Sequence, residues 1–289
     1  MPLENAQSRN MHAELRQIAV DAVRQVGPGL ADAFRQTMSI EMKADRHDLV
    51  TEHDRASERV LRDFLSRAAP GSSVVGEEFG RSGDGEVTWY IDPIDGTANF
   101  ARGLAFWCTS IGAAVNGQPV AGAIYDPVAN HLFSVDSTAS YLNDKPIIAE
   151  AAPRTEEAVL IFGYPSAADL RRDGKGPALE RFGALVEAFA TVRRPGSAAL
   201  SIAHVAAGWA DAAAGFSVHA WDVAAALPLL ERAGGRFQSF AFDAEGKAGV
   251  LDCPGYVATG RGVDYPLLNQ VAGDIARHRR AQAEPAPAN

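Results

Sequence analysis

Two aspartates that could bind one metal ion, Asp92 and Asp95, stand three residues apart in the chain. Pro93 fixes its own φ and biases Asp92 towards an extended conformation, so the pair is held rigidly. Two close carboxylates repel each other unless a cation lies between them, and oxygen ligands of this kind suit Mg²⁺ or Mn²⁺. The pair therefore predicts a divalent metal site.

The two residues that follow, Gly96 and Thr97, stand where a short helix could begin. Their backbone N–H groups would then point towards an anion such as phosphate, and the missing Cβ of Gly96 would permit close approach. A metal beside an anion-binding turn indicates phosphoryl transfer. Taken alone, an Asp-x-x-Asp-Gly sequence is also compatible with an ordinary Asp-rich turn.

A covalent aspartyl-phosphate mechanism is the rival chemistry for such a segment. Haloacid-dehalogenase-type phosphatases carry Asp-x-Asp-Gly-Thr, in which one carboxylate attacks phosphorus and the second, two residues on, acts as acid and base. Here the spacing is three and a proline intervenes, so the second carboxylate would be misplaced. We therefore set this mechanism aside.

The whole segment at residues 89–100, Trp-Tyr-Ile-Asp-Pro-Ile-Asp-Gly-Thr-Ala-Asn-Phe, resembles the signature of the inositol monophosphatase family. Every fixed position of Trp-x-x-Asp-Pro-x-Asp-Gly-Thr-x-Asn-Phe is met. The second family signature, Trp-Asp-x-Ala-Ala followed by Ala-Gly-Gly, is matched at residues 221–225 and 233–235. Shorter family elements are matched at residues 48–54 and 76–78. The resemblance covers the chain from about Met11 to beyond Ala258.

A cluster of Mg²⁺ ions is what this resemblance implies at the site. Glu77, Asp92 and the backbone carbonyl of Ile94 would hold a first ion. Asp92, Asp95 and Asp222 would hold a second, and a third, weaker ion would lie near Glu77. The resemblance thus implies two or three Mg²⁺ ions, and sensitivity to Li⁺.

The catalytic pair implied by the resemblance is Thr97 with Asp54, which would orient and deprotonate the attacking water without a covalent intermediate. Asp54 could instead only cap or pair on a helix. Glu78 is expected to lie outside the ligand set, and Lys43 is either a phosphate-side cation or a solvated charge. None of the seven histidines shows metal-ligand spacing, so we assign none to the site.

Substrate choice is expected to depend on residues 195–199 and 211–220. The first segment, Pro-Gly-Ser-Ala-Ala, resembles the family element lining the sugar side. Inositol-specific members carry an acidic residue seven positions before the second-signature aspartate, where this chain has Gly215. Inositol 1-phosphate remains the leading candidate, with histidinol phosphate, fructose 1,6-bisphosphate and other sugar phosphates as alternatives. The expected substrate-binding residues are Gly96, Thr97, Gly196, Ser197, Ala198 and Gly215.

A non-catalytic phosphate-ligand-binding protein is the alternative class of function. Such a protein, a phosphatase fold that lost its chemistry, would show a missing ligand. All the residues that the chemistry requires are present, namely Glu77, Asp92, Asp95, Thr97 and Asp222.

The composition limits the kinds of molecule that this protein is expected to bind. A net charge of −9 and a pI near 5.3 disfavour nucleic acid and anionic membranes, because both repel an acidic surface. Two cysteines make neither a disulfide framework nor a cysteine-based metal site, and no apolar run is long enough to span a bilayer. We expect a soluble cytoplasmic protein whose partner is a small phosphate ester, and the resemblance implies a homodimer.

The elements that must position these residues are grouped and not strictly alternated, which favours an α+β class. Apolar periodicity predicts helices at 11–38 (interrupted at Gly27-Pro28-Gly29), 52–69, 177–190, 198–208 and 221–233 (kinked at Pro228). Strands are predicted at 73–76, 87–91, 109–115, 120–125, 131–135 and 158–162. The family fold implied is a layered α/β/α/β/α sandwich.

We divide the chain into two halves and a tail. Residues 1–150 form an N-terminal half with most metal ligands. Residues 151–280 form a C-terminal half with Asp222 and the substrate side. Residues 281–289, rich in Ala and Pro, are expected to be a flexible tail.

Overall fold

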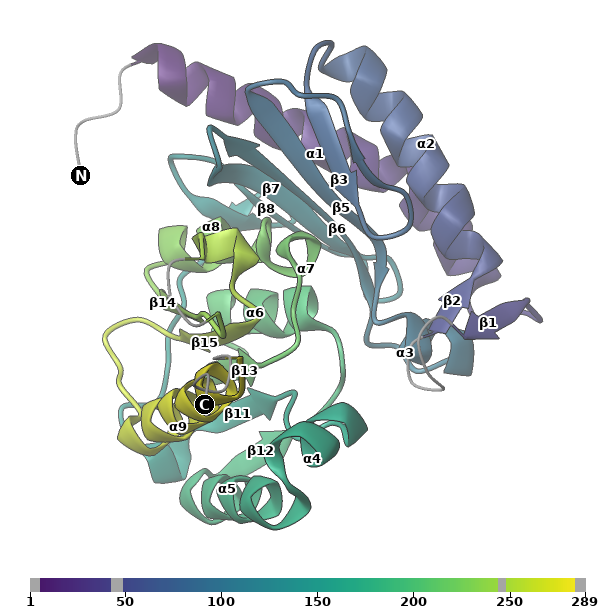
Figure 1. The fold of residues 1–289 in the computed structure, drawn as a ribbon. Helices are drawn as coiled ribbons and strands as arrows, with labels where there is room; N and C mark the ends of the chain where they lie inside the picture. The colour runs from purple at the N-terminus through teal and green to yellow at the C-terminus, as the bar shows by residue number, and fades with distance from the viewer. Residues whose placement is uncertain (1–5, 43–48, 244–247, 284–289) are drawn as a thin grey trace, which may run out of the picture.

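Two β-sheets alternate with three helical layers in the computed structural model, which describes residues 6–42, 49–243 and 248–283 (Figure 1). The first sheet has eight strands in the order β10 (Lys145–Pro146), β9 (Ser140–Leu142), β8 (His131–Val135), β7 (Gln118–Asp126), β6 (Cys108–Val115), β5 (Val87–Asp95), β3 (Ser73–Gly76) and β4 (Gly80–Ser82). The second has five, β12 (Thr191–Arg193), β11 (Val159–Phe162), β13 (Ala212–Gly215), β15 (Gly255–Thr259) and β14 (Arg236–Phe240). The layered α+β fold expected from the sequence is confirmed.

Helices cover both faces of each sheet. The outer layer on the first sheet is α1 (Ala6–Ala33) and α2 (Glu52–Ala68), and the central layer is α6 (Ala198–Ala206), α7 (Ala220–Val223) and α8 (Ala226–Arg232). The outer layer on the second sheet is α4 (Ala167–Asp173), α5 (Lys175–Ala188) and α9 (Pro266–Ala283). The remaining elements are the β1 (Ile40–Met42) and β2 (Leu49–Thr51) ribbon, the short helix α3 (Thr97–Arg102), and the 3₁₀ turns η1 (Thr155–Glu157) and η2 (Val250–Asp252).

The predicted interruption of the first helix is wrong, because α1 runs without a break through Gly27, Pro28 and Gly29. Gly27 is buried against Tyr125 of β7, and a Cβ there would lie 2.4 Å from Tyr125 Cε1. The glycine therefore lets the helix approach the sheet. Pro28 is exposed, and its missing N–H removes only one hydrogen bond of a long helix.

The helix predicted at 221–233 is divided into α7 and α8 at Ala224 and Ala225. Pro228 has no N–H to donate to the carbonyl of Ala224, four residues earlier, and its ring crowds that carbonyl. The expected kink is an interruption of the helix at Ala224 and Ala225, whose backbone stays in the α region. Asp222 lies before it, in α7.

Several elements had no prediction from the sequence. They include β12 to β15 of the second sheet and α9. Helix α9 extends to Ala283, so the first three residues of the expected tail are helical, and residues 284–289 lie outside the described chain. Lys43 also lies outside it. Among the described helices, none combines the length and apolar character needed to cross a bilayer.

Replacing Gly27 tests why α1 tolerates its glycines. We expect Gly27→Ala to lower the free energy of unfolding by about 1–3 kcal/mol, because the new methyl group overlaps the Tyr125 ring. Gly29→Ala is the matched control: it is exposed, a Cβ there meets nothing within 4 Å, and helix propensity should stabilise it by about 0.5–1 kcal/mol. Urea unfolding measures both, and equal effects would contradict this packing.

Candidate active site

A β-bulge turns Asp92 and Asp95 to the same side of strand β5. In a regular strand, residues three apart point to opposite faces of the sheet. Here Asp92 pairs with Ser110 and Asp95 with Cys108, so three steps along β5 match two along β6. The extra residue restores a common direction for both carboxylates.

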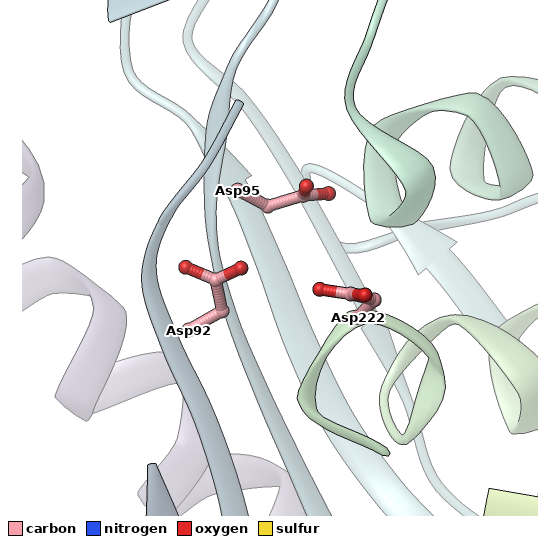
Figure 2. A group of neighbouring side chains, drawn as sticks. All are labelled: Asp92, Asp95 and Asp222. Atoms are coloured by element: carbon pink, nitrogen blue, oxygen red, sulfur yellow. The ribbon is translucent and has the colours of Figure 1, made fainter. Parts of the chain in front are cut away.

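Asp222 reaches the same place from the C-terminal half of the chain. It is the third residue of α7, and its Oδ2 accepts a hydrogen bond of 2.7 Å from the backbone N–H of His219, which caps the helix. Ligand atoms of Asp92, Asp95 and Asp222 all lie within 4.8 Å of one another, and Figure 2 shows the three carboxylates facing a common centre.

Burial and mutual repulsion raise the pKa values of these three acids. Burial raises the pKa of Asp95 to about 6, although Ser197 Oγ and Ala199 N each donate to its Oδ2 at 2.6 Å. Burial first, and then the charge of Glu77, raises the pKa of Asp92 well above its usual range. Burial and the charge of Asp95 do the same for Asp222. The cluster is therefore costly to ionise without a cation.

The set of donors fits a hard divalent ion. Three carboxylates converge, and Ile94 lines the same cavity, with its carbonyl oxygen 3.0 Å from Thr97 Oγ1. Oxygen donors without nitrogen or sulfur suit Mg²⁺. A bound cation would relieve the repulsion that raises the three pKa values.

Thr97 and Asp54 form a hydrogen-bonded pair beside the cluster. Thr97 Oγ1 lies 3.1 Å from Asp54 Oδ1, and the other carboxylate oxygen of Asp54 accepts 2.7 Å hydrogen bonds from the N–H and hydroxyl of Thr51. Asp54 therefore caps α2 and also contacts Thr97. Burial raises the pKa of Asp54 to about 6, against the lowering effect of Thr51.

The three aspartates and Thr97 line a cavity of about 700 Å³. Gly96 in its wall has φ of 100°, and a Cβ there would lie 3.0 Å from the carbonyl oxygen of Phe106. Of the residues expected at the site, the cavity is lined by Glu77, Asp92, Ile94, Asp95, Gly96, Thr97 and Asp222. Asp54 stands behind Thr97.

Sequence reasoning missed two cationic or titratable side chains that line this cavity, Arg194 and His219. His219 stacks on Trp221 at 4.8 Å between ring centroids. Its place three residues before Asp222, at the cap of a helix, was a usable signal. Arg194 follows β12 and carries no local motif. Glu78 is not among the residues that line this cavity, and its Oε2 lies 3.9 Å from Arg55 Nε. Its place outside the ligand set stays a prediction.

A second cavity, of about 180 Å³, holds the residues expected on the substrate side. Gly196, Ser197, Ala198 and Gly215 all line it, and it shares Arg194 with the first cavity. Ser197 donates its hydroxyl to Asp95, so this wall is tied to the acidic cluster. Gly215 ends β13, where a Cβ would lie 3.0 Å from Tyr256 Cε1.

A fully buried arginine, Arg279 of α9, binds residues of α4 and of the segment before α7, which contribute to the walls of the cavities. It binds Asp173 at 3.0 and 2.7 Å, pairs with Asp169, and donates to the carbonyl of Phe216 at 2.6 Å. Asp169 in turn accepts from the N–H of Ser166 at the start of α4. One guanidinium therefore fixes α4 and the segment before α7.

The fold and this site define a phosphoric monoester hydrolase. The family model for the inositol monophosphatase family matches residues 11–280, and the chain belongs to that family. It is 34% identical over 220 residues to a protein named Nus factor SuhB of Xylella fastidiosa, covering 75% of this chain and 79% of that protein. It is 32% identical over 261 residues to an inositol-1-monophosphatase of Mesorhizobium japonicum, covering 89% and 96%.

Solved structures agree with this membership. The structure of the extragenic suppressor protein suhB from Bartonella henselae superposes with a TM-score of 0.76 at 28% identity, covering 93% of this chain and 98% of that one. The shared fold extends through both halves of the chain.

The raised pKa of Asp95 has a sign that stability measurements can test. Without divalent metal, folded Asp95 holds its proton to about pH 6, whereas the unfolded chain releases it near pH 3.8. Wild type should therefore lose stability relative to Asp95→Asn as pH rises from 4 to 7, by up to about 3 kcal/mol. Denaturant unfolding in EDTA measures this difference.

The exposed Asp63 of α2 supplies the control, since Asp63→Asn should show no comparable change with pH. Added Mg²⁺ should stabilise wild type more at pH 7 than at pH 5, because protons compete for the same oxygens. A difference between wild type and Asp95→Asn that stays constant across this range would refute the electrostatic account.

Proposed function

We propose that this protein hydrolyses a small phosphate monoester with Mg²⁺ as cofactor. One observation carries the proposal: three converging carboxylates with raised pKa values lie beside a hydrogen-bonded Thr97–Asp54 pair in one cavity. The first element needs divalent cations, and the second can accept a proton. Family membership supports the combination.

The ligands in this proposal are Glu77, Asp92 and the Ile94 carbonyl for one Mg²⁺, and Asp92, Asp95 and Asp222 for another. A third ion near Glu77 remains part of the proposal. When bound, Mg²⁺ would neutralise phosphate charge and make a water molecule more acidic. Backbone N–H groups of Gly96 and Thr97 would bind phosphate oxygens.

The proton path runs through Thr97 and Asp54. Thr97 Oγ1 lies 3.1 Å from Asp54 Oδ1 and 3.0 Å from the Ile94 carbonyl oxygen. When its one proton is directed to Asp54, its lone pairs are available to a water molecule in the cavity. As that water attacks phosphorus in line, its proton passes to Thr97 Oγ1 and the threonine proton passes to Asp54. A pKa near 6 lets Asp54 be ionised at neutral pH and still accept a proton. The P–O bond to the alcohol breaks with its electron pair on the alcohol oxygen, and a second water molecule in the cavity protonates that oxygen. The proton held by Asp54 then replaces the one that this water gave up.

Inositol 1-phosphate is the leading substrate, as the names of relatives such as the Mesorhizobium protein suggest. Histidinol phosphate, fructose 1,6-bisphosphate and other sugar phosphates are the alternatives, because Gly215 offers no charged acceptor to a polyol. The proposal also includes a homodimer and inhibition by millimolar Li⁺. Light scattering that gives a single 30.6 kDa chain, or full activity in Li⁺, would contradict these two parts.

Phosphate release from inositol 1-phosphate, with Mg²⁺ or with EDTA, tests the activity directly. We expect Thr97→Val to lower kcat by about 10²–10⁴-fold, because the variant keeps the shape and loses the proton relay. Thr97→Ser should retain most activity. Both should keep the thermal stabilisation by Mg²⁺, since the carboxylates are intact. No release from any monoester by wild type would favour the non-catalytic alternative and overturn the proposal.

Substitutions at Gly215 test substrate choice independently of the hydrolysis reaction. We expect Gly215→Glu to raise kcat/KM for inositol 1-phosphate relative to glycerol 2-phosphate by about tenfold, through one charged hydrogen bond to a hydroxyl. Gly215→Gln is the control of equal size, since both side chains must displace the Tyr256 ring slightly. If both variants reduce all substrates in equal proportion, Gly215 does not face the leaving alcohol.

A further inference from the structure

A third cavity, of about 520 Å³, opens beside the metal cavity and shares Ser217, His219 and Trp221 with it. Its other walls come from the strands β3 to β5, from α4 and from η2. A substrate whose phosphate lies at the acidic cluster could therefore extend into it without crossing the protein interior. The mechanism described above makes no use of this space.

Two arginines line this cavity from opposite elements, Arg81 of β4 and Arg172 of α4. Arg81 makes one hydrogen bond, of 3.2 Å, to Ser73 Oγ, and Arg172 lies 5.7 Å from the centre of the Phe242 ring. In the part of the chain that the structure describes, neither guanidinium forms an ion pair. Most of their N–H donors are therefore available to a ligand.

Neutral donors and a flat surface accompany the arginines. Tyr90 and Trp221 also line the cavity, and neither the Tyr90 hydroxyl nor the Trp221 indole N–H has a hydrogen-bond partner among the described residues. The Trp221 ring is held in place by stacking on His219. Asp252, exposed in η2, is the single carboxylate among the lining residues. The lining thus offers donors in excess of acceptors.

A group rich in acceptors and negatively charged is what such a lining would bind. Guanidinium groups match the planar oxygens of carboxylate and phosphate, and their hydrogen bonds to these anions are stronger than neutral ones. A neutral polyol needs acceptors for its own hydroxyl protons, and this lining supplies few. The protein has a net charge of −9, which repels anions. Two arginines without an ion-pair partner would offset this repulsion locally.

We propose that this third cavity binds a second acidic group, phosphate or carboxylate, carried on the leaving alcohol of the substrate. The proposal rests on the proposed phosphatase function and adds the substrate class. Monoesters with a second acidic group bind more tightly than monoesters of the same skeleton without one. Inositol 1-phosphate, which has no second acid, would leave the cavity unused.

Two matched pairs of substrates test the proposal. Fructose 1,6-bisphosphate against fructose 1-phosphate reports on a second phosphate, and 2-phosphoglycerate against glycerol 2-phosphate reports on a carboxylate. For each pair, kcat/KM is measured with Mg²⁺ on wild type and on Arg81→Gln, Arg172→Gln and the double variant. In at least one pair, wild type should favour the substrate with the second acid, and the double variant should reduce that preference by about tenfold.

Arg67→Gln removes the same charge from the exposed end of α2, away from the described cavities, and should leave both preferences as in wild type. The preference should also weaken as salt is raised from about 50 to 500 mM. If the double variant changes both members of each pair equally, the subsite is refuted while the phosphatase stands. If wild type releases no phosphate from any of the four substrates, the proposed function itself fails.

Discussion

Repulsion among buried carboxylates is the constraint on which the rest of this structure depends. The carboxylates of Asp92, Asp95 and Asp222 lie within 4.8 Å of one another in a largely buried place, where burial and the charges of neighbouring carboxylates raise their pKa values. A fold holds such a group only if each carboxylate is fixed by other bonds. Asp95 is fixed by Ser197 and Ala199, and Asp222 by the cap of its helix. A bound cation would then lower a free energy that the fold has already raised.

Motif residues could be predicted from the sequence because their spacing encodes local backbone geometry. Pro93 lies in the bulged end of β5 and Gly96 directly after it, and the strand and helix patterns around them place the aspartates at one end of a sheet. The β-bulge could not be predicted, because it depends on the register between β5 and β6. The β13 strand, Ala-Ala-Ala-Gly, was also missed, because its buried small residues carry no β preference.

Contacts between residues far apart in the sequence could not be predicted, for a different reason. Arg279 reaches Asp169 and Asp173, more than a hundred residues earlier, and no spacing rule connects an arginine to such partners. The same holds for Arg194, which enters the cavity from a loop. At Gly27 the sequence predicted a helix break that the structure does not have. The glycine instead allows close packing of α1 against the sheet. Small residues can report on contact between layers as well as on chain direction.

Close packing at small residues also explains how Asp222 can lie next to the sheet. Gly112 of β6 and Gly122 of β7 face each other across the strands, beneath the break between α7 and α8. A Cβ on Gly112 would lie 2.5 Å from the carbonyl carbon of Ala224, and one on Gly122 would lie 2.9 Å from Ala225 Cβ. The paired glycines therefore make a hollow into which the Ala-Ala of the second signature fits. Since Asp222 lies two residues before the first of these alanines, any side chain in the hollow would push α7, and its carboxylate, away from β5. The cluster of carboxylates thus depends on the absence of side chains one layer below it.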